Sequence, residues 1–452
     1  MNSAERKSVL SLAMLYATRM LGLFMVLPVF VLYSDSLTEA TPTLIGVAIG
    51  AYGLSQALLQ IPFGALSDKF GRKPMLYMGL VIFCVGSVVA AVSDSIYGVI
   101  LGRFIQGAGA IASVIMALLS DLTTVESRTK AMALVGASIG LSFTVALILG
   151  PIVAEFGGLQ AIFWLTALLA FAALLWSIFV IPNPTVLTKN RDSRVFKDQL
   201  NDVLRDRELL RLDFGIFVLH LALTAMFIAI PMSLVTQAGL PAADHWWLYL
   251  GVLLGSFFAM VPFIIIGEKH SKMKLVFCFA IVLILASSLS MNWAANALGF
   301  FVVALFIFFM GFNLLEASLP SLVSKISPAG SKGTAMGVYS TSQFMGAFFG
   351  GLLGGTILSA FGVQGVYVMT SVLALAWLFV AVSMKNPKHE KTMTVFFNES
   401  LDEFQLNELS RELMLVSGVE DAVVVSDGVA YLKVSSKQFD DRDLEQLKQR
   451  FA

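Results

Sequence analysis

The chain has 452 residues, of which 57% are hydrophobic and only 13% are charged. A soluble protein of this length could not bury so much apolar surface in one core, so the composition excludes an ordinary soluble fold. The formal net charge is +0, and nothing in this balance predicts a nucleic-acid partner.

The apolar residues are grouped into twelve runs. Runs of about 20 residues can cross roughly 30 Å of hydrocarbon as helices, and helices satisfy the backbone hydrogen bonds that lipid cannot. We therefore predict an all-α polytopic membrane protein with twelve spans. The predicted spans are residues 9–33, 44–66, 75–93, 96–120, 131–155, 161–181, 213–236, 246–266, 275–292, 298–322, 335–360 and 364–384.

The basic residues predict the orientation of these spans. Arg19 and Arg103 lie within spans, and all the other Lys and Arg residues fall in the terminal segments and in alternate loops. Because Lys and Arg are retained on the inner side, both termini are predicted to be cytoplasmic. The opposite loops carry only acidic charges, namely Asp35, Glu39, Asp94, Glu155 and Asp244.

The spans divide into two six-helix bundles, residues 1–181 and 213–384. A charged cytoplasmic linker, residues 182–212, joins them, and Arg194 to Leu212 could form an amphipathic helix within it. Residues 385–392 form a second, short linker to the C-terminal segment.

The C-terminal segment, residues 393–452, is less hydrophobic and acidic overall. Asp427-Gly428 between two runs of strand-forming residues is a strong hairpin signal. We predict a small cytoplasmic α/β domain with a ferredoxin-like β-α-β-β-α order. Its strands are predicted over residues 393–397, 421–426 and 429–434, and its helices over 403–416 and 441–451.

A short charged segment joins the second and third spans. It reads Gly64-Ala-Leu-Ser-Asp68-Lys-Phe-Gly71-Arg72-Lys73, and two spans joined by so tight a turn must form a helical hairpin. A basic loop that only sets topology would explain the basic residues, but it would not explain glycines and an aspartate at fixed offsets. A weaker echo, residues 267–274, lies between spans eight and nine and indicates a duplicated six-helix unit.

This segment, its position and the 6+6 layout resemble the major facilitator superfamily, whose signature here is G-x-L-(S/A)-D-x-x-G-R-(R/K). The resemblance implies a conformational latch between the two halves in an outward-open state. Asp68 would meet the N-terminus of span eleven near Gly333, where a helix stabilises a carboxylate. Arg72 would pair with Asp121 on span four. The predicted latch residues are Gly64, Asp68, Gly71, Arg72, Lys73 and Asp121.

Span four carries Arg103-Phe-Ile-Gln106-Gly-Ala-Gly109. It is similar to a second motif of the superfamily, R-x-x-Q-G-x-G, which is associated with proton coupling. An arginine within a span usually faces protein or a wet cavity. The alternative is a side chain that snorkels to the outer surface, since Arg103 lies within two turns of that end.

Span five ends with Gly150-Pro151, a partial match to the antiporter motif g-x-x-x-G-P-x-x-G-G of the superfamily. The match departs at Ala146, Ala154 and Glu155. The alternative is a packing kink, in which Gly136 and Gly140 are sites of close helix contact.

Four ionisable residues are expected inside the membrane, and such residues are functional candidates by default. They are Arg19 on span one, Arg103 on span four, His220 on span seven and Glu316 on span ten, one on each helix that lines the central cavity in the resembled superfamily. We expect Glu316 to exchange a proton against substrate or an arginine, with Asn313 on the same helix face. His220 is either a proton carrier or a packing residue.

Two spans carry polar stripes. Tyr52, Gln56 and Gln60 recur at four-residue spacing on span two, and Tyr339 and Gln343 repeat the spacing on span eleven. Side chains four residues apart share one helix face. These residues therefore either line the cavity or form hydrogen bonds between helices.

Three stretches, Arg19–Pro28, Ala117–Thr123 and Gly333–Gln343, are similar to the bacterial YajR-type transporters of the superfamily, which also carry a small C-terminal α/β domain. The expected function is proton-coupled secondary transport in the bacterial inner membrane, as an antiporter that exports a small organic compound. The alternative is a membrane sensor, in which the helical body binds a ligand and the C-terminal domain signals.

An enzyme is not expected, because the sequence contains no nucleophile–base pair, phosphate-binding loop or metal cluster. Cys84 and Cys278 both lie in spans, so neither a disulfide framework nor a cysteine metal site is predicted. No cofactor is expected. The expected partners are a small-molecule substrate, protons, the lipid bilayer and a cytoplasmic ligand or protein for the C-terminal domain, and the chain is expected to be a monomer.

Overall fold

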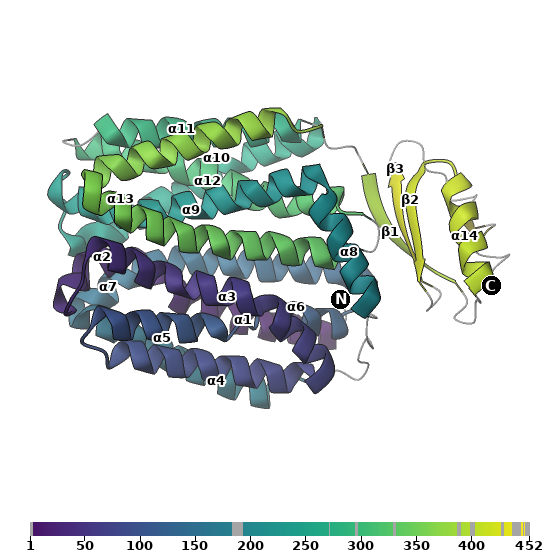
Figure 1. Ribbon diagram of the computed structural model, residues 1–452, viewed down its shortest axis with the longest axis horizontal. Helices are drawn as coiled ribbons and strands as arrows, with labels where there is room; N and C mark the ends of the chain where they lie inside the picture. The colour runs from purple at the N-terminus through teal and green to yellow at the C-terminus, as the bar shows by residue number, and fades with distance from the viewer. Residues whose placement is uncertain are drawn as a thin grey trace.

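The computed structural model describes residues 3–182, 193–270, 272–293, 297–328, 331–386, 390–397, 403–425, 429–435, 444, 445 and 447. Long helices form a bundle, and a small α/β unit lies beyond one end of it (Figure 1). We call the end of the bundle next to the α/β unit the inner end, and the opposite end the outer end. The predicted helical membrane body is confirmed.

The first half of the bundle starts with α1 near the inner end and continues in antiparallel order. Gly71 separates α3 from α4 with a φ of 97°, a conformation that residues with a side chain rarely adopt. The tight turn predicted from the charged segment therefore depends on this glycine. The elements are α1 (Ser3–Phe24), α2 (Phe30–Tyr33), η1 (Ser34–Ser36), α3 (Pro42–Phe70), α4 (Arg72–Ala91), α5 (Ile96–Ala108), α6 (Ala112–Asp121) and α7 (Val125–Phe179).

The second half follows a helix that lies across the inner end. Its elements are α8 (Ser193–Arg205), α9 (Arg207–Thr236), η2 (Ala242–Asp244), α10 (His245–Lys269), α11 (Met273–Trp293), α12 (Leu298–Ile326) and α13 (Lys332–Val382). Helix α13 packs against both α9 and α3, and so joins the two halves.

The linker helix is shorter than predicted. The amphipathic pattern predicted one helix over 194–212, but α8 ends at Arg205. Asp206 is non-helical, and its carboxylate accepts hydrogen bonds from the backbone N–H groups of Glu208 and Leu209. An aspartate in this geometry caps a new helix, so α9 begins at Arg207, earlier than residue 213.

Helices α7 and α13 each contain two helices that meet at a kink. Non-helical backbone occurs at Gly157 and Gly158 in α7 and at Gly362 in α13. The predicted spans five and six therefore lie in α7, and spans eleven and twelve lie in α13.

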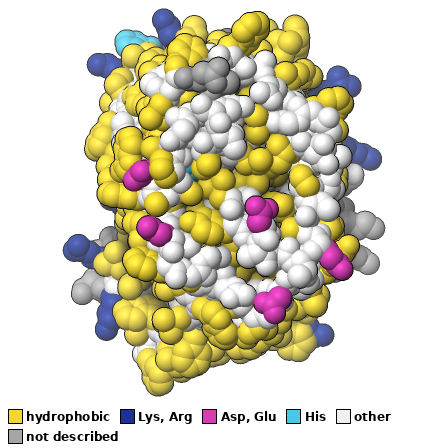
Figure 2. Space-filling model, turned by 90° about the vertical axis from the view of Figure 1, so that its left-hand side faces the viewer, with side chains coloured by type: hydrophobic (Ala, Val, Ile, Leu, Met, Phe, Trp, Pro, Cys, Tyr) yellow, Lys and Arg dark blue, Asp and Glu magenta, His cyan; other side chains and the backbone are white. Residues whose placement is uncertain are grey.

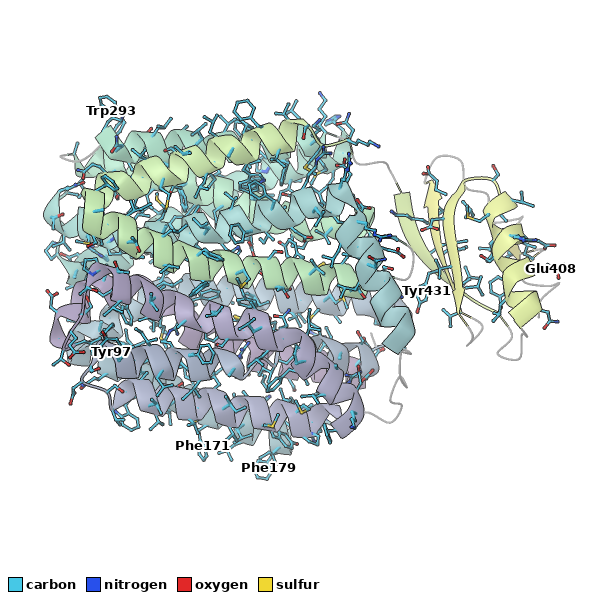
Figure 3. The ribbon with its side chains drawn as sticks, viewed as in Figure 1. Tyr97, Phe171, Phe179, Trp293, Glu408 and Tyr431 are labelled. Carbon is cyan, nitrogen blue, oxygen red and sulfur yellow. The ribbon has the colours of Figure 1, made fainter. Side chains whose placement is uncertain are left out.

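Large apolar side chains cover the outside of the bundle. Phe171, Phe179 and Trp293 point away from it (Figure 3). Within the described residues, nine helical stretches are long and apolar enough to cross a membrane. Because water would disfavour such a surface, the protein is a multi-pass membrane protein.

The outer end carries acidic side chains. Figure 2 shows this face, with Asp and Glu side chains spread across it and the Lys and Arg side chains in view at its periphery. Asp35 in η1 follows α2 directly, and Asp244 lies in η2. The asymmetry agrees with the charge pattern, whereas the orientation of the termini stays a prediction.

The α/β unit has a three-stranded antiparallel sheet with strand order β1-β3-β2. Helix α14 lies against it, and Leu409 and Leu413 are buried with Ala430, Leu432 and Val434 of β3. The predicted hairpin turn at Asp427-Gly428 lies outside the described residues, as does most of the predicted last helix. The elements are β1 (Glu390–Phe396), α14 (Glu403–Leu415), β2 (Val419–Val425) and β3 (Val429–Ser435).

Candidate functional site

Three polar side chains from three helices of the second half meet inside the bundle. Gln343 on α13 places its Nε2 atom 2.8 Å from Nε2 of His220 on α9 and 3.3 Å from Oε1 of Glu316 on α12. Nε2 of His220 lies 3.9 Å from the other carboxyl oxygen, Oε2. One amide thus bridges two titratable groups.

The orientation of the bridging amide depends on whether its two neighbours are protonated. As placed, the NH₂ group of Gln343 donates to an unprotonated ring nitrogen of His220 and to the carboxylate of Glu316. Turned by 180°, the amide oxygen would occupy the same place and accept from a protonated ring nitrogen and a carboxylic acid. The cluster therefore has two self-consistent hydrogen-bond patterns, which differ in protonation.

The first half has a separate buried network around Arg19. This residue is 1% exposed, and its Nη2 atom donates to Oε1 of Gln56 at 2.7 Å and to the carbonyl of Gly109 at 3.0 Å. Gln56 in turn lies 3.4 Å from Gln60. Nε and Nη1 of Arg19 have no hydrogen-bond partner among the described residues. The span-two stripe therefore contacts α1 by hydrogen bonds.

Arg103 is buried between α5 and α3. Its guanidinium donates to the carbonyls of Ala48 and Ile49, at 3.4 Å each, and to Oε1 of Gln106 at 3.0 Å. Gln106 also donates to Ser87 on α4 at 2.8 Å. Because Arg103 is 1% exposed, the alternative of a side chain that snorkels to the outer surface is wrong.

Tyr52 connects the two halves. The guanidinium carbons of Arg19 and Arg103 lie 5.7 Å and 5.3 Å from the centre of its ring, within the range of cation–π attraction. The same ring packs edge-on against Phe344 on α13, at 6.3 Å between centres. Phe344 follows Gln343 directly, so a short path of contacts runs from the arginines to the amide bridge.

Asn313 does not join the cluster of Glu316. Its Nδ2 atom donates to Ser256 on α10 at 3.2 Å, whereas Glu316 contacts α13. The two side chains lie within one helical turn on α12 but contact different neighbouring helices.

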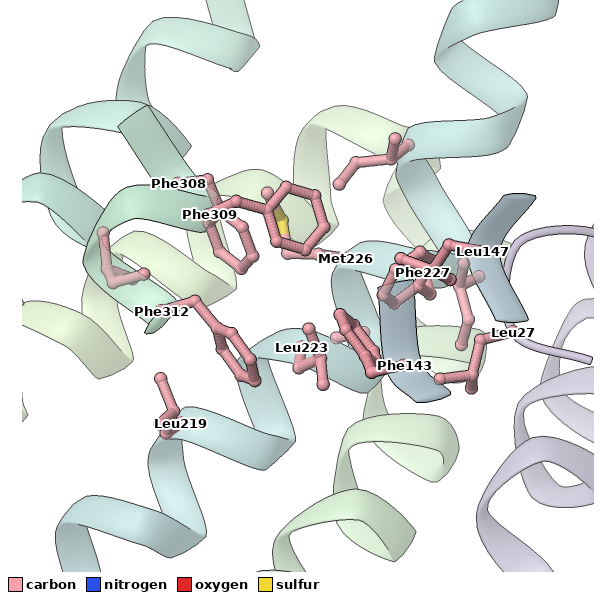
Figure 4. Packing of buried hydrophobic residues seen from close by; sticks show 14 of the residues in the cluster. Leu27, Phe143, Leu147, Leu219, Leu223, Met226, Phe227, Phe308, Phe309 and Phe312 are labelled. Atoms are coloured by element: carbon pink, nitrogen blue, oxygen red, sulfur yellow. The ribbon is translucent and has the colours of Figure 1, made fainter. Parts of the chain in front are cut away.

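An aromatic seam joins the two halves of the bundle, with Phe143 beside Phe227, Phe309 and Phe312 (Figure 4). Phe143 on α7 packs against Phe227, Phe309 and Phe312 of the second half, with ring centres 6.0–6.4 Å apart. Phe312 also lies 6.0 Å from the ring of His220. The seam therefore lies directly beside the titratable cluster.

The same face of α7 is uncovered toward its inner end. Gly136, Gly140, Phe143 and Leu147 share one helix face. Phe143 and Leu147 are buried, but an added Cβ at Gly136 or Gly140 would meet nothing within 4 Å. The predicted role of these two glycines in close helix packing is therefore wrong, because no neighbouring helix lies close to them.

Helices α3 and α13 touch closely near their outer ends. A Cβ at Gly46 would collide with the backbone carbonyl of Gly351, and a Cβ at Gly50 would lie 2.7 Å from the carbonyl of Phe348. Helix backbones approach so closely only where side chains are absent. The close contact between these two helices of opposite halves therefore lies near their outer ends.

The charged segment between α3 and α4 forms an ion cluster at the inner end. Arg72 binds Oδ2 of Asp121 at 3.0 Å and also pairs with Asp68. It donates to Ser67 at 2.7 Å, and Lys73 donates to the carbonyl of Ile181 at 2.8 Å. These four contacts lie within the first half.

The predicted partner of Asp68 is engaged elsewhere. Thr334, at the N-terminus of α13, donates to Gln199 of α8 at 3.2 Å. The Asp68 side chain is 47% exposed, and Gly64 faces Ser113 of α6 in its own half. In this conformation the ion pairs of Arg72 join Asp68 and Asp121 of the first half, whereas the N-terminus of α13 contacts α8.

Two features of the site were absent from the sequence predictions. Phe143 gave no signal, because an aromatic residue in an apolar helix has no distinctive pattern. Asp213 sits at the predicted start of span seven, where a charge is expected near the membrane surface, yet it is buried in α9. The described residues include no group of three or more His, Cys, Asp or Glu side chains suited to a metal ion.

A multi-pass bundle with a buried polar cluster in each half is typical of membrane transport proteins. Residues 12–241 and 212–416 match the Major Facilitator Superfamily, and the chain belongs to this superfamily.

Relatives span nearly the whole chain. The inner membrane transport protein YajR of Escherichia coli (strain K12) is 46% identical over 448 residues, which cover 99% of this chain and 98% of that protein. Quinolone resistance protein NorA of Staphylococcus aureus (strain MSSA476) is 24% identical over 376 residues, covering 81% and 94%. The crystal structure of the nucleoside transporter NupG superposes with a TM-score of 0.66 at 14% identity, covering 83% of this chain and 99% of that one. The similarity to NupG shows that the two proteins share a fold.

Proposed function

We propose that the protein is a proton-coupled antiporter of the bacterial inner membrane, which exports a small organic compound by alternating access. The observation that carries this proposal is the Gln343 amide, which bridges His220 and Glu316 on three different helices. A site with two protonation-dependent hydrogen-bond patterns can favour different helix arrangements with and without a proton. The resistance protein among the relatives supports export of an organic compound.

In this proposal the twelve helices form a 6+6 arrangement with both termini in the cytoplasm. Nine spans come from the nine apolar stretches. Helix α1 and the second helices of α7 and α13 supply the other three. The α/β unit would then lie in the cytoplasm, next to the inner end.

The proposed cycle starts from an inward-open state. Open space beside Gly136 and Gly140, together with the closed seam at Phe143, supports this assignment. Substrate would bind from the inner side to the deprotonated cluster. After the halves rock, a proton arriving from the outer side would protonate Glu316 and displace the substrate. The protonated site would then return inward and release its proton.

We further propose that the ion cluster of Asp68, Arg72 and Asp121 is the inner latch of the outward-open state. Closure of the inner end would bring the exposed Asp68 carboxylate to the N-terminus of α13, where the helix dipole favours negative charge.

Asp68→Asn is expected to weaken the outward-open state and to lower transport, while membrane insertion is unchanged. The asparagine keeps the size of the side chain but loses the charge that attracts the helix terminus, an effect of roughly 0.3–1 kcal/mol at an exposed helix end. Distances between spin labels on the two halves measure the populations, with Asp35→Asn at the outer end as the control. Unchanged populations of inward-open and outward-open states would count against the latch.

The C-terminal unit is proposed to regulate the helical body. Lys433 on β3 donates from Nζ to the carbonyl of Ile326, the last residue of α12, at 2.9 Å. A cation at this position stabilises a helix C-terminus. Because α12 also carries Glu316, the contact joins the unit to a helix of the proposed proton site.

Truncation after Lys385 is expected to leave a membrane-inserted protein that still binds substrate but transports it at a changed rate. The transport helices end before this point, whereas the contact with α12 would be lost. Lys433→Met, which removes only that contact, should reproduce part of the change. A truncated protein that fails to insert would show that the segment belongs to the core fold.

Accumulation in proteoliposomes tests the proposed function. A thermal-shift screen of the purified protein supplies a ligand, which is then offered to proteoliposomes with and without a pH gradient. We expect uptake against the ligand's own gradient only when protons can flow in the opposite direction. A ligand that binds but is never moved would instead favour the membrane sensor, for which the Lys433–Ile326 contact would be the signalling connection.

A further inference from the structure

Asp213 is a buried carboxyl on α9 that the proposed transport cycle does not use. It is 7% exposed, and its Oδ2 atom is buried without a hydrogen-bond partner among the described residues. An ionised carboxylate in such a place is costly. The group therefore requires a proton or a transient partner.

Tyr339 lies on α13 one helical turn before the bridging Gln343, on the same helix face. It is 3% exposed, and its hydroxyl has no hydrogen-bond partner within the described part of the chain. The Oε2 atom of Glu316 is also buried and unpartnered there. Unsatisfied buried oxygens on three neighbouring helices indicate a path for water or protons.

These groups follow the length of α9. Asp213 precedes His220 by two helical turns, so both lie on one face, about 10 Å apart along the axis. That face packs on α13, since Gly346 and Gly350 approach Phe217 and Leu221 closely. The path therefore runs from the inner end of α9 to the bridging amide.

The other charged groups near the inner ends of these helices are already partnered or lie at helix termini. Glu208 and Arg211 on α9 form an ion pair with each other, and Lys325 on α12 pairs with Glu268 on α10. Lys332 is the first residue of α13. Among the described residues, Asp213 forms no ion pair with any of them.

We propose that Asp213 is a second proton-binding residue, which passes protons between Glu316 and the inner solution along Tyr339. This inference rests on the proposed proton coupling at Glu316. On release, the carboxylic acid of Glu316 loses its proton to the tyrosine oxygen while the tyrosine's own O–H proton passes to the Asp213 carboxylate, directly or through water. One O–H bond breaks at Glu316, one forms at Asp213, and the phenol is regenerated without a co-reactant.

Infrared difference spectroscopy of the full-length purified protein after a rapid pH change tests this path without any substrate. We expect two protonated-carboxyl bands that respond to pH, one lost in Asp213→Asn and the other in Glu316→Gln. The proton exchange rate of Glu316 should fall roughly tenfold or more in Asp213→Asn, because a positioned relay group is removed. Tyr339→Phe should slow the exchange while keeping both bands. Asp206→Asn is the matched control, because asparagine also caps a helix, and it should exchange at the wild-type rate.

A wild-type exchange rate of Glu316 in both Asp213→Asn and Tyr339→Phe would overturn the path while leaving the proposed function intact. Bands that respond to Na⁺ at constant pH, and not to pH, would replace the proton site by a cation site. A Glu316 band that does not respond to pH at all would overturn the proposed function together with this inference. Should Asp213→Asn fail to fold, the rate in Tyr339→Phe decides.

Discussion

Replacement of Glu316 by glutamine is expected to abolish proton-driven transport while substrate-for-substrate exchange continues. Glutamine keeps a hydrogen-bonding group opposite Gln343, which contacts Glu316 at 3.3 Å, but it cannot take up a proton. The helices could still rearrange with substrate bound, whereas the proton would lose its site. Net accumulation driven by a pH gradient should fall to the level of protein-free liposomes, and counterflow of labelled against unlabelled substrate should stay within about twofold of the wild type.

Glu268→Gln provides a matched control, because this carboxylate lies on the inner surface, exposed and 3.8 Å from Lys325. It should behave as the wild type in both assays. Normal pH-driven accumulation by Glu316→Gln would show that the proton binds elsewhere, and His220 would become the next residue to replace.

Gly351→Leu is expected to shift the protein strongly toward the outward-open state. A side chain at this position would collide with the backbone of Gly46 on α3, so the outer ends of α3 and α13 would have to separate. Overpacking of this kind typically costs about 1–3 kcal/mol, which would change the ratio of the two states by roughly 5- to 150-fold. Spin labels on the outer ends of the two helices should report longer distances.

Gly337→Leu is the corresponding control on the same helix, because an added Cβ there would meet nothing within 4 Å. It should leave the distances as they are in the wild type. If Gly351→Leu also left them unchanged, the close contact of α3 and α13 could not be the outer closure of the transport cycle.

Local patterns made the membrane body and the inner ion cluster predictable. Hydropathy reports each helix separately, and the pairing of Arg72 with Asp121 followed from a charged segment of fixed spacing. The break between α8 and α9 was harder to predict. The amphipathic pattern continues through Asp206, but the side chain of Asp206 caps a new helix there.

The candidate site itself could be predicted only as separate residues. Glu316, His220 and Gln343 were each found on their helices, but their meeting at one amide depends on how α9, α12 and α13 pack. For Gly136 and Gly140 the sequence predicted a close helix contact that the structure does not contain. Small residues suit a close helix contact and an open gap equally well, and only the packed structure distinguishes the two.

Simultaneous measurement of proton and solute flux tests the central claim most directly. Proteoliposomes holding a pH-sensitive dye and a substrate identified by thermal shift would be given a proton gradient across the membrane, with the wild-type protein and Glu316→Gln compared side by side. The account predicts that in the wild type protons and substrate move in opposite directions in a fixed ratio, and that both net fluxes stop together in the variant. Substrate movement at the same rate with and without the gradient, or proton flux independent of substrate, would contradict it.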